Sequence, residues 1–164
     1  MDKVKLILAS KSPRRQALIE SLGFPFEVRI KEVDEVYPTE LASENVPVFL
    51  AELKAQPLIN QLKVGEVLIT SDTVVINDGV ILGKPKDNAD AFNMLQSLSG
   101  KSHKVVTGVC IQSKSTKVSF SETTIVHFSV LTETEINYYI NNYKPFDKAG
   151  SYGIQEWIGA IAVH

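Results

Sequence analysis

The 164-residue sequence contains a single cysteine, Cys110, so no disulfide bond can form within the chain. It also lacks CxxC pairs and Cys/His clusters of the kind that hold zinc through thiolates. The apolar stretch near its start, residues 4–9, is far shorter than a signal-peptide core with a cleavage site, and no other run approaches the length of a membrane span. We therefore predict a cytoplasmic protein without a membrane segment.

The chain has no large excess of either charge. Its 17 basic and 19 acidic side chains give a formal net charge of -2, which does not favour duplex DNA or an anionic membrane as a partner. Any anion site must therefore be local. Repeats, low-complexity tracts and Gly/Ser linkers are also absent, and a hydrophobic fraction of 44% is ample for one core. These features predict a single domain over residues 1–164.

The hydrophobic pattern alternates between strand and helix periods. A nearly continuous apolar run over residues 4–10 predicts a central strand that is covered on both faces. Ser12, Pro13 and Gly23 then mark the cap, the first turn and the end of a helix. Further strands are expected at residues 26–30, 66–78, 79–83, 103–113, 117–131 and 157–163, and further helices at 43–62, with Pro57 as a kink or break, 87–100 and 133–143. Together they predict an α/β domain with a mixed β-sheet flanked by helices.

The segment at residues 10–15, SKSPRR, places Arg14 and Arg15 in the first turn of the first helix. Cations are unfavourable there, because the free N–H groups already make a helix N-terminus positive. A phosphate group bound by the serines, the amides and the guanidinium groups would resolve this conflict. The alternative is that both arginines point into solvent or pair with distant acids. The chain contains neither a Walker nor a Rossmann phosphate-binding loop.

Asp72 lies between hydroxyl residues in an otherwise apolar strand. Unpaired burial of a polar group costs about 2 to 7 kcal/mol, and more for a charge, so Asp72 must have partners. It could accept a proton from water or bind a divalent cation, or it could merely bridge backbone groups. Taken alone, a lysine such as Lys54 or Lys84 is more often a solvated or snorkelling side chain than a ligand contact. Together with the arginines and Asp72, they provide the cations and the base that phosphoryl chemistry requires.

The segment at residues 147–155, DKAGSYGIQ, combines two glycines with a glutamine. The glycines would let the backbone approach a ligand closely, and Gln155 offers both a donor and an acceptor for the imide edge of a pyrimidine. The alternative is an ordinary turn. His103 and His127 are interpreted as structural, since the histidines show no metal-ligand spacing.

Four segments in order resemble the Maf family of nucleoside triphosphate pyrophosphatases: LASKSPRRQALIESLG, SDTVV, LGKPKDNADAFNMLQSLSGKSHKVVTGV and DKAGSYGIQ. The resemblance implies a fold like that of the inosine triphosphate pyrophosphatases and hydrolysis of a nucleoside triphosphate to the monophosphate and pyrophosphate. It also implies a divalent cation, Mg²⁺ or Mn²⁺, and suggests a homodimer. Family members continue through a Gly-Leu-Pro segment to a terminal helix, so the sequence is expected to lack the C-terminal segment of the family beyond His164.

Within that family, Thr73 and the YGIQ sequence at residues 152–155 resemble the branch that acts on dTTP and UTP rather than the branch that acts on 7-methyl-GTP. The resemblance makes Asp72 the proton acceptor. It ties Arg14, Thr73 and Gln155 to the choice of substrate.

Three further basic residues, Arg15, Lys54 and Lys84, match positions that the family places around the phosphates. Glu35 falls near an acidic position that would allow it to share a metal with Asp72. The resemblance leaves a second function open, a nucleotide-binding regulator of cell division and septum formation in which hydrolysis is incidental. Asp72 favours the enzyme, because a pure sensor does not need an acid beside its ligand.

Overall fold

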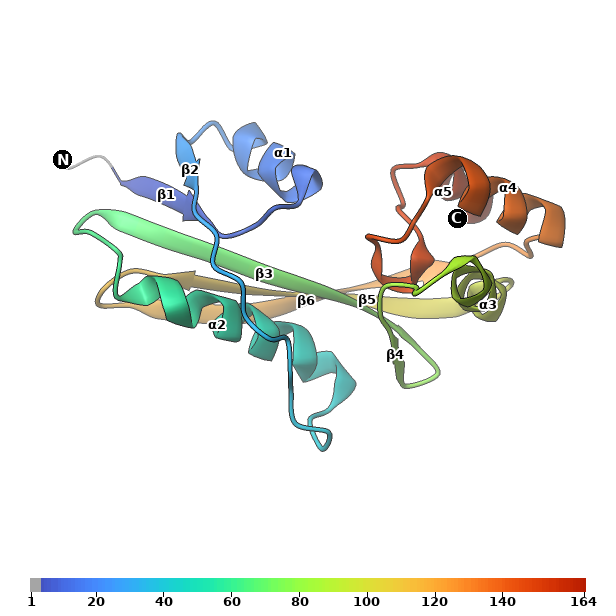
Figure 1. Ribbon diagram of the computed structural model, residues 1–164, viewed down its shortest axis with the longest axis horizontal. Coiled ribbons are helices and arrows are strands. Elements are labelled where there is room, and N and C mark those ends of the chain that lie inside the picture. Colours follow the sequence, from blue (N-terminus) through green and yellow to red (C-terminus); the bar gives the residue numbers. More distant parts are fainter. Residues whose placement is uncertain (1–3) are drawn as a thin grey trace. The chain divides into compact units, whose positions relative to one another are not determined.

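The computed structural model describes residues 4–164, which form a mixed α/β fold with a six-stranded sheet (Figure 1). The strands are β1 (Lys5–Leu8), β2 (Phe26–Val28), β3 (Glu66–Asn77), β4 (Val80–Leu82), β5 (Ser102–Gln112) and β6 (Lys117–His127). The helices are α1 (Pro13–Ser21), α2 (Val46–Ile59), α3 (Asn88–Leu98), α4 (Glu133–Tyr143) and α5 (Trp157–Ala162), with single 3₁₀ turns at Ser43–Asn45 and Ala149–Ser151. Within residues 4–164, no helix is both long and apolar enough to cross a membrane.

The sheet has the order β2-β1-β3-β5-β6, and β4 pairs with the end of β3. Strand β1 is parallel to both of its neighbours, with Leu6 opposite Phe26 in β2 and opposite Val67 in β3. This position agrees with the apolar run that predicts a covered, central strand. Strands β3 and β4 are antiparallel, so the sheet is mixed and the predicted fold class is confirmed.

Internal contacts divide the chain into two compact units, each with an apolar core. The first unit comprises the chain up to Asp72 together with Thr107–Glu122, and the second comprises Thr73–Val106 together with Thr123–His164. The first core consists of Ile7, Ala51, Ala55, Leu58, Leu62, Leu68 and Cys110. The second core is built mainly from α3, α4, α5 and the strand ends at Val75 and Val126.

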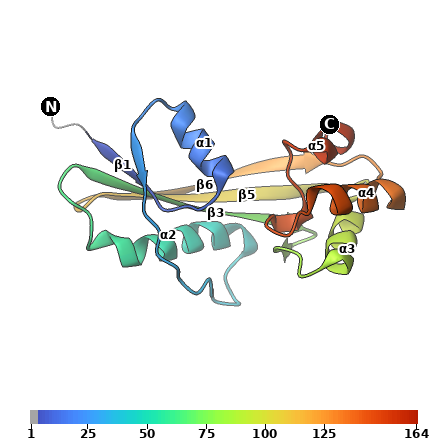
Figure 2. The same ribbon diagram turned by 45° about the horizontal axis from the view of Figure 1, so that its top comes forward.

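In the first unit, α1 and α2 lie on opposite sides of the strands β1 and β3 (Figure 1, Figure 2). Helix α2 supplies most of the helical side chains of that core and continues through Pro57 to Ile59, so Pro57 does not break it. Helix α1 begins at Pro13 after Ser12, as predicted, but it buries no residue fully. Its apolar stripe is exposed, with Leu18 and Leu22 more than half accessible to solvent.

In the second unit, local sequence signals account for the turns and helix ends. The β3–β4 turn uses positive φ angles at Asp78 and Gly79, as the Asn-Asp-Gly sequence predicts. The side chain of Asp87 caps α3 by accepting the Asp90 N–H at 2.8 Å. Thr132 and Glu135 form a capping box at the start of α4, as the Thr-Glu-Thr-Glu sequence of residues 132–135 favours.

The prediction of a final strand at residues 157–163 is wrong. This segment forms α5, and only Val163 makes a β-bridge, with Phe128. Short apolar runs do not distinguish a strand from a buried helical turn by periodicity. Burial shows the helical period instead, because Ile158 and Ala162, four residues apart, are both buried in the second core.

Candidate active site

Asp72, Lys54 and Glu35 form one charged cluster in the first unit. The Lys54 ammonium donates to Asp72 Oδ1 at 2.6 Å and lies 2.9 Å from Glu35 Oε1. Asp72 is buried in β3, Lys54 projects from α2 with 18% of its side chain exposed, and Glu35 is half exposed. The buried carboxylate is therefore neutralised by a side-chain cation, which distinguishes it from an aspartate that only bridges backbone groups.

The position of Lys54 follows from close packing of α2 on the strands. In β3, the Thr70 hydroxyl donates to the Ala51 carbonyl of α2 at 2.6 Å. At Gly108 of β5, an added Cβ would lie 2.2 Å from the carbonyl carbon of Pro47, in the first turn of α2. Only glycine allows the helix backbone to come this close to the strand. These two contacts fix both the depth and the register of the helix that carries Lys54.

Arg15 reaches the same part of β3 from α1. Its Nη1 donates to the Ser71 carbonyl at 2.7 Å. Burial lowers the pKa of the Arg15 guanidinium below its ordinary value, and the neighbouring Asp72 carboxylate opposes that shift. The positive charge of Arg14 lowers this pKa as well, so the two arginines lie close enough to repel one another. Arg14 itself is exposed.

The first unit therefore brings together five of the charged residues that the sequence singles out. Three are cations, Arg14, Arg15 and Lys54, and two are carboxylates, Asp72 and Glu35. An excess of cations around a buried acid suits a polyanionic ligand that must meet a base. In residues 4–164, no group of three or more His, Cys, Asp or Glu side chains is placed to hold a metal. Among the described residues, the cluster offers a divalent ion the carboxylates of Asp72 and Glu35.

The remaining predicted site residues belong to the second unit. Thr73 follows Asp72 in β3 and is half-buried, whereas Lys84 and Gln155 are exposed. Gly150, in the 147–155 segment, has a φ of +67°, and its Cβ would lie 2.8 Å from Val75 Cγ2. This glycine is thus required by the turn and by packing against Val75, rather than only by access for a ligand.

A buried polar network, which sequence reasoning missed, supports the segment that carries Gln155. The Gly153 N–H donates to the Tyr139 hydroxyl at 3.0 Å, and that hydroxyl donates to Glu156. The buried Lys148 ammonium lies 3.1 Å from Glu156 Oε1. Burial and the Glu156 carboxylate raise the pKa of Tyr139. Tyr139 also packs in the second core, and the helical pattern of residues 133–143 contains no signal for its hydroxyl.

His103 is structural, as predicted. Its Nε2 and the Tyr152 hydroxyl are hydrogen-bonded at 2.7 Å within the second core. Burial, with a smaller contribution from His127, lowers the pKa of His103 to about 4, so the ring is neutral at physiological pH.

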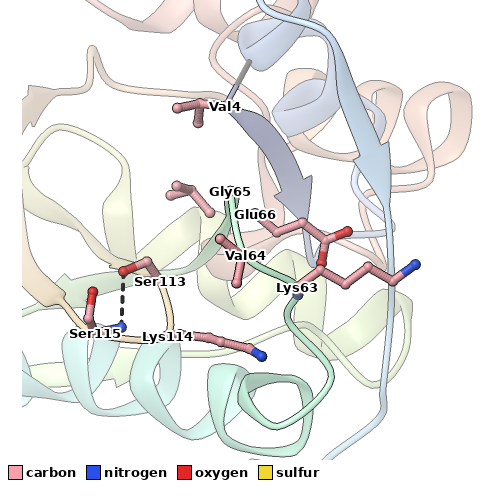
Figure 3. A pocket seen from close by; sticks show the side chains of 9 residues that line it. Val4, Lys63, Val64, Gly65, Glu66, Ser113, Lys114 and Ser115 are labelled. Atoms are coloured by element: carbon pink, nitrogen blue, oxygen red, sulfur yellow. Dashed lines mark hydrogen bonds between the residues drawn. The ribbon is translucent and has the colours of Figure 1, made fainter. Parts of the chain in front are cut away.

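A pocket of about 300 Å³ lies elsewhere in the first unit (Figure 3). Its lining residues are Val4, Lys63, Val64, Gly65, Glu66, Val67, Ser113, Lys114 and Ser115. None of them belongs to the charged cluster. The carboxylate of Glu66 already accepts three hydrogen bonds. Arg29 donates to both of its oxygens at 3.0 and 3.1 Å, and the Lys63 N–H donates at 2.9 Å. We therefore do not assign the chemistry to this pocket.

Because Glu66 accepts these hydrogen bonds, its contribution to the stability of the protein should depend on pH. The hydrogen bonds from Arg29, then the one from the Lys63 N–H, lower the pKa of Glu66 from 4.5 to about 2. A carboxylate whose pKa is depressed by folding stabilises the protein above its ordinary pKa, and this contribution is lost as the pH falls toward 2. We expect Glu66→Gln to lower the free energy of urea unfolding at pH 7. The difference in this free energy between the variant and wild type should become smaller by pH 3. If the difference in unfolding free energy is the same at pH 3 and pH 7, the lowered pKa of Glu66 is contradicted.

The family model for Maf-like proteins matches residues 5–164. A protein named dTTP/UTP pyrophosphatase from Christiangramia forsetii is 50% identical over 159 residues, which cover 97% of this chain and 81% of that protein. A protein of the same name from Bacteroides thetaiotaomicron is 49% identical over 164 residues, covering 99% of this chain and 85% of its own length.

Solved structures that resemble this one share little of its sequence. A HAM1 protein from Coxiella burnetii aligns with a TM-score of 0.53 at 12% identity, covering 76% of this chain and 73% of its own. The Staphylococcus aureus Ham1 protein aligns with a TM-score of 0.51 at 14% identity, covering 76% and 71%. At such low identity the likeness concerns the fold alone, and it agrees with the expected inosine triphosphate pyrophosphatase type.

Proposed function

Because this chain belongs to the family of Maf-like proteins, we propose that it hydrolyses dTTP and UTP to the monophosphate and pyrophosphate. Relatives at 48–50% identity over nearly the whole chain carry the name dTTP/UTP pyrophosphatase, which supports this substrate class. The observation that carries the proposal is the charged cluster itself. A buried carboxylate, Asp72, faces the Lys54 ammonium and lies next to the Arg15 contact on Ser71.

In the proposed reaction, Asp72 acts as the general base. In the ligand-free protein the Lys54 ammonium contacts Oδ1, and Oδ2 is the oxygen placed to accept a proton from water as the water oxygen attacks the α-phosphorus. The bond between the α-phosphorus and the bridging oxygen breaks, and pyrophosphate leaves with its electron pair. Burial of Asp72 in β3 holds the carboxylate in one orientation, which reduces the entropic cost of the attack.

The three cations of the cluster bind the triphosphate. Arg14 and Arg15 present guanidinium groups that can each contact two phosphate oxygens, and Lys54 contributes a single mobile ammonium. Negative charge on the leaving pyrophosphate increases as the bond breaks, and these cations stabilise it. The roles of Thr73, Lys84 and Gln155 in recognising the nucleotide stay predictions.

A divalent cation, Mg²⁺ or Mn²⁺, fits the donors of the cluster. Mg²⁺ in nucleotide enzymes is usually bound by one or two carboxylates and the substrate phosphates. Asp72 and Glu35 would hold it, because one oxygen of each already lies within 2.9 Å of the same nitrogen. When bound, the ion would neutralise charge on the phosphates.

The arginines provide a test in which activity and stability move in opposite directions. Arg14→Ala removes a cation from the α1 N-terminus, where it is unfavourable by roughly 0.3 to 1 kcal/mol, so the ligand-free protein should be no less stable. The same change removes a charge-assisted contact to phosphate, typically worth ~1.5 to 3 kcal/mol, and should lower kcat/KM about tenfold or more. Thermal melts and steady-state rates check both. A destabilised but fully active variant would refute the phosphate role.

We place this reaction in the cytoplasm, which the buried, unpaired thiol of Cys110 supports. The homodimer suggested by the sequence stays a prediction.

The substrate proposal is tested with a panel of nucleoside triphosphates and Mg²⁺ or Mn²⁺, with pyrophosphate measured directly rather than as total phosphate. We expect dTTP and UTP to be hydrolysed faster than ATP, GTP and 7-methyl-GTP. Nucleotide binding without pyrophosphate release would instead favour the regulator of cell division.

A further inference from the structure

Lys54 lies where a divalent ion would bind to Asp72 and Glu35. Its ammonium lies between two carboxylates, 2.6 Å from Asp72 Oδ1 and 2.9 Å from Glu35 Oε1. These oxygens belong to the two carboxylates that would hold a divalent ion. An ammonium and a divalent cation compete for these two carboxylates, because two cations held close together on the same acids repel each other. One of the two cations must therefore leave before the other binds.

We propose that Lys54 is an exchangeable counter-ion that keeps divalent metal off Asp72 and Glu35 until a triphosphate binds. This inference rests on the proposed function, since it requires a triphosphate in the cluster. The triphosphate offers the ammonium a new anionic partner, and Lys54 then moves from the carboxylates to the phosphates. Metal and nucleotide binding are thereby coupled, and each tightens the other by the same factor.

Three features of the cluster support this exchange. The ammonium is carried on a flexible four-carbon stem, so it can move while α2 stays fixed. Glu35 is half exposed and not confined by burial, so its carboxylate can turn toward an incoming ion. Arg15 interacts with both Asp72 and Glu35, so the acids keep a nearby positive charge when Lys54 leaves.

The test measures Mn²⁺ binding to the full chain without nucleotide, by electron paramagnetic resonance of the free ion. Lys54→Met keeps the length of the side chain and removes its charge. We expect it to bind Mn²⁺ at least about tenfold more tightly than wild type, within the usual range of coupling between two sites. Lys54→Gln, which keeps a hydrogen-bond donor beside the acids, should show the same direction if the methionine variant does not fold.

A matched control is Lys117→Met. Lys117 also pairs with a glutamate at 2.9 Å, Glu52, but outside the cluster, and its loss should leave Mn²⁺ affinity unchanged. Adding Glu35→Gln to Lys54→Met should abolish the gain. Equal Mn²⁺ affinity in wild type and the Lys54 variants would overturn the proposal, as would a gain that survives Glu35→Gln.

The nucleotide arm uses α,β-methylene dTTP, with Mn²⁺ binding to the analogue alone subtracted. The analogue should tighten Mn²⁺ binding to wild type strongly and Mn²⁺ binding to Lys54→Met much less. Equal tightening in both proteins would contradict the exchange. Neither metal measurement depends on turnover. Tighter Mn²⁺ binding by Lys54→Met together with a wild type that releases no pyrophosphate would refute the proposed function and leave the counter-ion role standing.

Discussion

Asp72→Asn should lower kcat about 10²- to 10⁴-fold, the usual contribution of a general base, while nucleotide binding remains measurable. Asparagine has nearly the same shape, so the strand should keep its geometry, but its amide cannot accept the proton of the attacking water. The cations Arg14, Arg15 and Lys54 stay in place to hold the triphosphate. Steady-state pyrophosphate release and calorimetric binding of α,β-methylene dTTP measure the two effects separately.

Asp78→Asn is the matched control for this change. Asp78 lies in the β3–β4 turn with a φ of 49°, a conformation that asparagine also adopts readily. Its exposed carboxylate lies 3.3 Å from the Lys101 ammonium and does not belong to the charged cluster, so kcat should be unchanged. If Asp72→Asn has the kcat of wild type, Asp72 is not the general base.

Gly108→Ala should be strongly destabilising. The new Cβ would lie 2.2 Å from the Pro47 carbonyl carbon and 2.3 Å from the Val48 nitrogen. Both atoms belong to the backbone and cannot rotate away, so α2 must move off β5. We expect a loss of about 3 kcal/mol or more, which lowers Tm by roughly 6 to 12 °C in a domain of this size. Because α2 carries Lys54, kcat/KM should fall as well.

Gly83→Ala provides the comparison, since an added Cβ there has no neighbour within 4 Å and no positive φ opposes it. Its Tm should stay within about 2 °C of wild type, because surface changes of this kind usually alter stability by less than about 0.5 kcal/mol. A Gly108→Ala protein with a wild-type Tm would show that α2 does not pack on β5 as closely as described.

Local signals in the sequence predict much of this fold. Pro13 at the start of α1, Asp87 before α3 and the Thr132 capping box mark helix starts that the structure confirms. The Asn-Asp-Gly turn predicts the β3–β4 hairpin. Each of these features depends on neighbours within about four residues, which is the range over which sequence patterns are informative.

Features that depend on distant residues were not predictable in this way. Residues 157–162 form a helix because Ile158 and Ala162 join a core built by other elements. The pairing of Lys54 with both Asp72 and Glu35 requires α2 to pack against β3. Sequence reasoning identified these charged residues through their chemistry and the family resemblance, but not the ammonium between the two acids.

Hydrolysis of dTTP in H₂¹⁸O tests the central claim most directly. If Asp72 directs water to the α-phosphorus, mass spectrometry should find one ¹⁸O atom in the monophosphate and none in the pyrophosphate. The same label should be nearly absent from both products with Asp72→Asn over the same time. Label in the pyrophosphate, or release of inorganic phosphate in place of pyrophosphate, would contradict the mechanism.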